Sequence, residues 1–285
     1  MRPIFIGGTG RCGTRAVRRA LGRHPEISAL PAEFRIFSDP GGLVDLYAAL
    51  THEWTPVRAG IALRVFAERC EAVTNGHYCR SRTFWHAVGG LEQWRAHCET
   101  LLTALSSYRG LGHWVDRSMT TNFFHGRYDA TDPLEAINAW IRGLLPSEVW
   151  VDDTPCSPLR APAITRMYPS AVFVWLQRDL RDVLGSMTQG RGTDVAGLRL
   201  SARRLTYTYR RFADMADEFL CYELSEVIAE PGRVLGEIVR AVGLEPVAGW
   251  KHGLNEDDAH LGRWTTDFTA EERAALPWFF GHAHP

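Results

Sequence analysis

Gly8-Thr9-Gly10-Arg11-Cys12-Gly13-Thr14-Arg15 is the stretch that decides how the chain begins to fold. An apolar run from Pro3 to Ile6 precedes it, and apolar residues recur at helical spacing between Ala16 and Leu21. The pattern predicts a strand, a glycine loop and a helix. A helix N-terminus at such a junction presents unpaired amides to an anion. We therefore expect a phosphate site on this loop, with charge from Arg11 and a hydroxyl from Thr14.

The same loop also satisfies the Gly-x-Gly-x-x-Gly fingerprint of dinucleotide-binding proteins, through Gly8, Gly10 and Gly13. Glu33 lies about where the ribose-binding acid of that fingerprint belongs. Against this reading, Pro31 separates Glu33 from the predicted second strand, and the arginines and threonine of the loop suit a multiply charged phosphate. A nucleotide-dependent (NAD-type) oxidoreductase remains the alternative function, and a glycine-rich turn without a ligand remains the alternative structure.

The rest of the chain alternates short apolar runs with helical patterns, which is typical of a doubly wound sheet. We predict an α/β, P-loop-like three-layer fold with a mainly parallel central sheet, built as a single domain of residues 1–285. Residues from about 40 to 148 show helix-like patterns and no clean strand, so we expect a helical insertion on the acceptor side of the site. The expected strands after the first are Ile27–Leu30, Val149–Val151, Ala171–Leu176 and Phe219–Tyr222.

A second motif, from Val174 to Met187, follows a continuous apolar run. Arg178 comes at the predicted end of that strand, and Ser186 lies eight residues later on the predicted helix, which brings it back toward the same edge. An arginine fork and a hydroxyl can clamp a phosphate group. The alternative is that Arg178, Arg181 and the neighbouring aspartates form solvated ion pairs at the start of a helix.

The two motifs together resemble the nucleotide site of sulfotransferases that use PAPS (3′-phosphoadenosine 5′-phosphosulfate), including bacterial, Golgi-type and tyrosylprotein sulfotransferases. The first motif is similar to their 5′-phosphosulfate loop: Arg11, Gly13 and Thr14 match it. Cys12 stands where the family usually has serine, and Arg15 replaces a second hydroxyl residue. Backbone amides at these positions can still bind phosphate.

The second motif resembles the family's 3′-phosphate motif, which implies that Arg178 and Ser186 bind the 3′-phosphate of the nucleotide. By the same resemblance, Tyr222 packs near the adenine, and Gly262 with Arg263 forms a C-terminal element that closes on the nucleotide. The resemblance covers residues of about 1–35 and 149–275, and the middle third of the chain is not matched.

The resemblance also implies the catalytic groups. Glu33 begins a Glu-x-Arg element similar to that of the Golgi-type enzymes, which makes it the candidate general base. The family often has a lysine before Thr-Pro, where this chain has Asp153. Arg11 is then the candidate for stabilising the leaving phosphate. Asp153 competes with Glu33 as the base, and a histidine, His113 or His125, is a further alternative.

The implied function is transfer of a sulfuryl group from PAPS to a hydroxyl of a small-molecule, lipid or glycan acceptor, with PAP (3′-phosphoadenosine 5′-phosphate) as the product. A catalytically impaired protein that binds PAP or PAPS is the non-enzymatic alternative, because Asp153 replaces the usual lysine. The acceptor's identity and the oligomeric state cannot be predicted from the sequence.

The composition indicates which partners to expect. A formal net charge of −1 and a pI of about 6.8 provide no basic field for nucleic acid. The six cysteines show no metal-ligand spacing, and no apolar run is long enough to suggest a transmembrane helix. We therefore expect a cytoplasmic protein without a metal, a nucleic-acid partner or a membrane-spanning segment.

Overall fold

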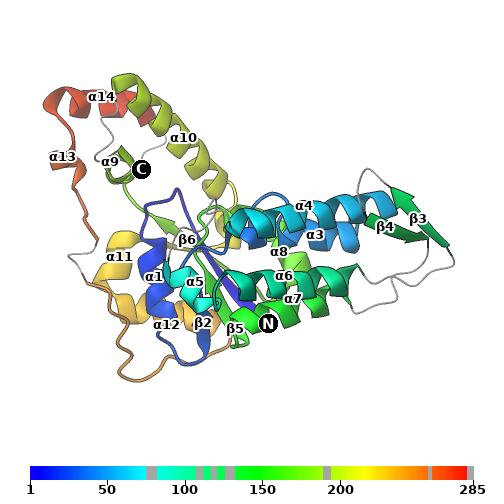
Figure 1. Ribbon diagram of the computed structural model, residues 1–285. Helices are drawn as coiled ribbons and strands as arrows, with labels where there is room; N and C mark the ends of the chain where they lie inside the picture. The colour runs from blue at the N-terminus through cyan, green and yellow to red at the C-terminus, as the bar shows by residue number, and fades with distance from the viewer. Residues whose placement is uncertain are drawn as a thin grey trace.

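Five parallel strands form the central sheet, in the order β2-β5-β1-β6-β7 (Figure 1). The computed structural model describes residues 1–74, 82–106, 112–116, 121–125, 132–188, 194–255 and 259–280. The predicted α/β three-layer fold is confirmed, and its central sheet is parallel throughout. The strands are β1 (Arg2–Gly7), β2 (Ile27–Ala29), β5 (Val149–Asp152), β6 (Val172–Gln177) and β7 (Leu220–Glu223).

The two faces of the sheet differ in the kind of side chain they bury, because successive residues of a strand point to opposite faces. One face is aliphatic and packs against helices α1 (Thr14–Leu21) and α12 (Pro231–Ala241). The other face is aromatic and packs against α8 (Ala161–Met167) and the end of α10 (Val195–Ala213). The aliphatic set includes Ile4, Ile6, Val149, Val151, Val174 and Leu176, and the aromatic set Phe5, Trp150, Phe173 and Trp175.

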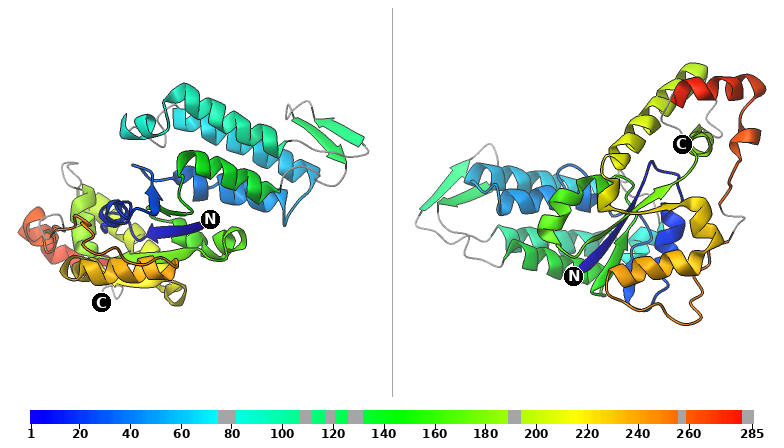
Figure 2. Two further views of the ribbon diagram at one scale, coloured as in Figure 1. Left: turned by 90° about the horizontal axis from the view of Figure 1, so that it is seen from below. Right: turned by 180° about the vertical axis from the view of Figure 1, so that it is seen from behind.

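Most of the middle third of the chain is helical, as expected, and projects to one side of the sheet (Figures 1 and 2). It also contains an antiparallel pair of strands, which the sequence pattern did not indicate. Each strand carries two adjacent apolar residues, Trp114-Val115 and Phe123-Phe124, and therefore shows no alternation of apolar and polar residues. The elements are α3 (Leu43–Leu50), α4 (Pro56–Thr74), α5 (Arg82–Ala87), α6 (Leu91–Leu105), β3 (Gly112–Asp116), β4 (Thr121–His125) and α7 (Pro133–Leu144).

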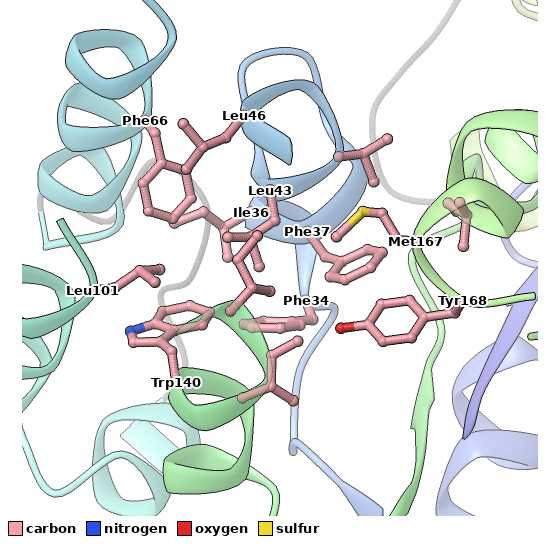
Figure 3. Close-up of a cluster of buried hydrophobic side chains, with 14 of the residues drawn as sticks. Phe34, Ile36, Phe37, Leu43, Leu46, Phe66, Leu101, Trp140, Met167 and Tyr168 are labelled. Carbon is pink, nitrogen blue, oxygen red and sulfur yellow. The ribbon is translucent and has the colours of Figure 1, made fainter. Parts of the chain in front are cut away.

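Aromatic side chains join this helical segment to the sheet. Phe37 in α2 (Arg35–Ser38) lies 5.1 Å from Phe5 of β1 and 5.3 Å from Trp150 of β5, between ring centroids. Phe34, just before α2, stacks on Trp140 of α7 at 5.8 Å (Figure 3). The segment that follows β2 is therefore held in a core shared by the sheet and the insertion.

The remaining helices complete the C-terminal half. Helix α9 packs against α10 and α14 through a third apolar cluster. Among the described residues, no helix is both long enough and apolar enough to cross a membrane. These elements are η1 (Ser157–Arg160), α9 (Leu180–Thr188), η2 (Ala216–Glu218), α11 (Leu224–Ala229), α13 (Trp264–Asp267) and α14 (Ala270–Phe280).

Candidate functional site

A cavity of about 480 Å³ opens where the carboxyl ends of the sheet strands meet, which is the usual ligand position in open α/β sheets. The loop after β1, the loop after β2 and the residues after β5 and β6 all reach it. Most of the predicted site residues line this cavity: Arg11, Gly13, Thr14, Arg15, Glu33, Arg178 and Ser186. Asp153, Pro155, Ala16, Arg19, Leu224, Ile228, Leu254, Ala259 and His260 also contribute to the wall.

The glycine loop leads directly into the N-terminus of α1. Gly13 is the N-cap residue, with φ of 92°, and no side chain caps the helix. This positive φ favours glycine, and a Cβ at Gly13 would lie 2.6 Å from Leu224 Cδ1, so the leucine side chain would have to move to admit one. The open N-terminus fits the predicted anion site.

Cys12, predicted as part of the loop's binding surface, turns its side chain into the apolar core between α1 and the sheet and is fully buried. Burial raises the pKa of its thiol to about 11. The thiol therefore does not reach the cavity, and only the backbone of Cys12 could contribute to anion binding.

Arg178 joins the second motif to the glycine loop. Its Nη1 donates to the carbonyl of Arg11 at 2.9 Å, and its Nη2 donates to the carbonyl of His260 at 2.6 Å. The Arg11 guanidinium in turn donates from Nε to Ser186 Oγ at 3.1 Å. Arg11, Arg178 and Ser186, remote in the sequence, thus form one contiguous polar surface.

Asp182 fixes the C-terminal segment to the same surface. Its carboxylate accepts from the amide of Gly262 at 2.8 Å and from the amide of Trp264 at 2.9 Å. Asp182 is 1% exposed, so the alternative of solvated ion pairs does not apply to it. Sequence reasoning considered Asp182 only as a member of a solvated ion pair, because its partners Gly262 and Trp264 lie about 80 residues away in the chain.

Two predicted nucleotide-binding side chains lie outside the cavity wall. Tyr222 is 6% exposed, and its hydroxyl donates to Glu237 Oε2 of α12 at 2.9 Å. Arg263 pairs with Asp267, with Nε 2.6 Å from Oδ2. Gly262 also is absent from the wall, whereas the neighbouring His260 is part of it.

Glu33 lies on a loop that is anchored by the residue after it. The amide of Phe34 donates to Asp152 Oδ1 at 2.7 Å, and the Phe34 ring is buried in the aromatic cluster (Figure 3). The Glu33 carboxylate remains about one-third exposed, 3.9 Å from the Arg35 guanidinium. Burial raises its pKa, the charge of Asp153 raises it further, and Arg35 opposes the rise.

Asp153, at the position of the expected lysine, forms a buried ion pair. Its Oδ1 lies 2.8 Å from Arg18 Nε, and the two side chains are 2% and 3% exposed. The N–H of Arg18 Nε is not aimed at that oxygen well enough to count as a hydrogen bond, so the contact is chiefly electrostatic. Sequence reasoning missed Arg18, although it falls among the buried positions of α1.

The strand order argues against the dinucleotide alternative. In that fold the second strand pairs directly with the first. Here β5 lies between β1 and β2. Glu33 therefore follows a strand at the edge of the sheet rather than the neighbour of β1, where a ribose-binding acid belongs.

A comparison with protein families finds that residues 3–247 match the model described as the sulfotransferase family. The chain belongs to this family. Its family and fold indicate transfer of a sulfuryl group. No curated protein matches the chain.

A search of solved structures finds sulfotransferases, and the first of them supports the similarity in fold. The sulfotransferase domain from the Synechococcus PCC 7002 olefin synthase is 14% identical, with 100% of this chain and 95% of that chain covered and a TM-score of 0.52. Sulfotransferase STF9 from Mycobacterium avium is 16% identical, with coverage of 98% and 75% and a TM-score of 0.46. A sulfotransferase from Alicyclobacillus acidocaldarius is also 16% identical, with coverage of 98% and 96% and a TM-score of 0.43.

The buried carboxyl of Asp152, beside the site, makes the stability of the fold depend on pH. Burial raises the pKa of its carboxyl from the usual 3.8 to about 7, the charge of Asp153 adds to the rise, and the hydrogen bonds from Phe34, Thr154 and Ser157 oppose it. Because the folded protein binds this proton more tightly than the unfolded chain, the resulting stabilisation is present at low pH and is lost as the pH rises toward about 7.

We predict that Asp152→Asn removes this pH dependence while it keeps an acceptor for the Phe34 amide. The free energy of unfolding of the parent, measured relative to that of the variant, should fall as the pH rises from about 4 to about 7. Urea denaturation at a series of pH values measures it. A difference that stays constant across this range would show that Asp152 titrates normally.

Proposed function

We propose that the protein transfers the sulfuryl group of PAPS to a hydroxyl of an acceptor and releases PAP and a sulfate ester. The observation that carries the proposal is one cavity lined by both an uncapped helix N-terminus and the Arg178–Ser186 pair. PAPS carries anionic groups at its 5′ and 3′ positions, so it needs two anion sites at one cavity.

In this proposal the amides of residues 11–15 and the Thr14 hydroxyl bind the 5′-phosphosulfate. Arg178 and Ser186 bind the 3′-phosphate. The carbonyls of Arg11 and His260 occupy one N–H on each terminal nitrogen of Arg178, and a guanidinium carries five N–H donors. Donors therefore remain for a phosphate, and the two carbonyls hold the fork in place.

The chemistry proposed for the site resembles phosphoryl transfer. The acceptor oxygen forms a bond to sulfur while the bond between sulfur and the bridging phosphate oxygen breaks. Glu33 takes the proton of the acceptor hydroxyl, and PAP leaves with the bond's electron pair. The raised pKa of Glu33 suits a general base, because the proton affinity of a carboxylate increases with its pKa.

Charge that develops on the leaving phosphate needs a cation, and the proposed residue is Arg11, helped by the helix N-terminus. In the structure the Arg11 guanidinium is turned toward Ser186. Arg15 is a second candidate, because it lines the cavity and its charge acts on Glu33. Asp153 is less suited to serve as the base than Glu33, because it already faces the Arg18 guanidinium.

The alternative histidine bases, His113 of β3 and His125 of β4, have side chains that lie outside the part of the chain that the structure describes. A protein that binds PAP without turnover would keep both anion sites and lack transfer. The proposed acceptor is a small molecule, a lipid or a glycan that bears a hydroxyl.

We predict that Arg178→Ala weakens PAP binding by about 1.5–3 kcal/mol, the cost of losing a hydrogen bond to a charged group. Isothermal titration calorimetry measures the affinity. The matched control is Arg181→Ala, which removes an arginine of the same motif that pairs with Asp179 and stacks on Trp264. If both variants bind PAP as tightly as the parent, the 3′-phosphate assignment is wrong.

We predict that Glu33→Gln lowers the rate of transfer from PAPS by about 10²–10⁴-fold, because the amide keeps the shape of the side chain and loses its basicity. PAP affinity should stay near that of the parent. Single-turnover transfer to 4-nitrophenol and sulfate release to water, both at saturating PAPS, measure the rate. A parent-like rate in Glu33→Gln together with a large loss in Asp153→Asn would assign the base to Asp153 instead.

A further inference from the structure

Arg18 connects three segments that build the candidate site. Its Nε faces Asp153 after β5, its Nη1 donates to the carbonyl of Leu30, and its Nη2 donates to the carbonyl of Pro31 at 3.3 Å. Arg18 belongs to α1, whose N-terminus is the proposed 5′-phosphosulfate site. One buried guanidinium therefore links helix α1, the residue that follows β5 and the loop that leads from β2 to Glu33.

The loop that carries Glu33 is consequently held on both sides. Arg18 binds the carbonyls of Leu30 and Pro31 before Glu33, and Asp152 binds the amide of Phe34 after it. A loop fixed at both ends holds the backbone of Glu33 in place, and with it the point from which the carboxylate extends. Arg18 itself is absent from the cavity wall, so its effect on the site must act through other residues.

A buried ion pair is a costly way to achieve stability alone. The free-energy cost of removing two charges from water offsets most of the attraction between them. Well-packed apolar residues in the same place are often as stabilising as the ion pair. An arginine nevertheless suits this position, because its planar fork has separate donors for a carboxylate and two carbonyls. A lysine ammonium is a point charge that cannot reach three acceptors in this arrangement.

We propose that Arg18 is a positioning residue for transfer, which holds Glu33 over the phosphate loop by clamping the Leu30–Pro31 backbone to Asp153. The proposal rests on the assignment of Glu33 as the base. It predicts that Arg18 affects the rate of transfer and leaves the affinity for PAP unchanged.

The charges around Glu33 provide a second readout. Glu33 faces Asp153 after β5, Arg15 from α1, Arg35 from α2, and Asp39 at the end of α2. The Cys156 thiol, after β5, also faces it. Of the two carboxylates that raise the pKa of Glu33, Asp153 has the larger effect, so removing Asp153 should lower that pKa. The acidic limb of the rate profile should then move to lower pH.

The test compares Arg18→Lys, and the double variant Arg18→Met with Asp153→Leu, against the parent. The double variant replaces both charges by apolar groups of similar size, which protects folding if the lysine variant fails to fold. Arg160→Met is the matched control, because Arg160 also joins a carboxylate, Asp45, to a main-chain carbonyl, that of Ser38. Arg160 lies outside the cavity wall.

Three measurements suffice: PAP affinity by calorimetry, single-turnover sulfate release from PAPS, and amide hydrogen exchange of residues 30–35 by mass spectrometry. Both Arg18 variants should bind PAP as tightly as the parent and should exchange the amides of residues 30–35 faster. Their rate of sulfate release should fall by about 10²-fold, because a small displacement of a reacting group reduces the rate by about this factor. When sulfate release is measured over a range of pH, the acidic limb of the rate profile of the double variant should also lie at lower pH than that of the parent. Arg160→Met should match the parent in all three measurements.

A folded Arg18 variant with parent-like rate and parent-like exchange at residues 30–35 would overturn the proposal. Faster exchange throughout the protein, with loss of PAP binding, would assign Arg18 a general role in stability and would overturn it as well. A parent protein that neither binds PAP nor releases sulfate would instead contradict the proposed function, and the exchange data would still report on the clamp.

Discussion

The rest of the site depends on one constraint. The glycine loop packs closely against the residues at the ends of β5 and β6. A Cβ at Gly7 would lie 2.4 Å from the carbonyl oxygen of Pro155, and one at Gly8 would lie 2.5 Å from that of Leu176. Only glycine permits this packing. Because the loop lies between the ends of β5 and β6, the start of α1, the residues around Asp153 and the Arg178 fork all meet at one cavity.

The electrostatics of the cavity follow from that convergence. The chain as a whole carries almost no net charge, so the proposed anion site depends on local positive charge. The cavity is lined by arginines from the glycine loop, from α1 and from the end of β6. The positive N-terminus of α1 lies at the same cavity. Asp153 stands where the family usually has a cation, and Arg18 pairs with it. Beside Glu33 the structure therefore has a carboxylate where the sequence resemblance led us to expect a lysine, and in the proposed mechanism the cation is Arg11 or Arg15.

Local patterns allowed the sheet and much of the cavity wall to be predicted. Apolar runs followed by Gly8–Arg15 and by Arg178 mark strands whose ends carry polar residues, and parallel strands bring such ends to one edge. The predictions failed where tertiary contacts decide. No local signal links Arg18 to Asp153, or Asp182 to the Gly262 amide, because these partners lie far apart in the sequence. The resemblance also could not show that the Tyr222 hydroxyl donates to Glu237 of α12.

The most direct test of this account is a crystal structure of the protein with PAP bound. The account predicts the 5′-phosphate within hydrogen-bonding distance of the amides of residues 11–15, and the 3′-phosphate on Arg178 and Ser186. The Glu33 carboxylate should face the 5′ end of the nucleotide, on the side from which an acceptor hydroxyl would approach. PAP bound elsewhere, with the glycine loop empty in the same crystal, would contradict the account.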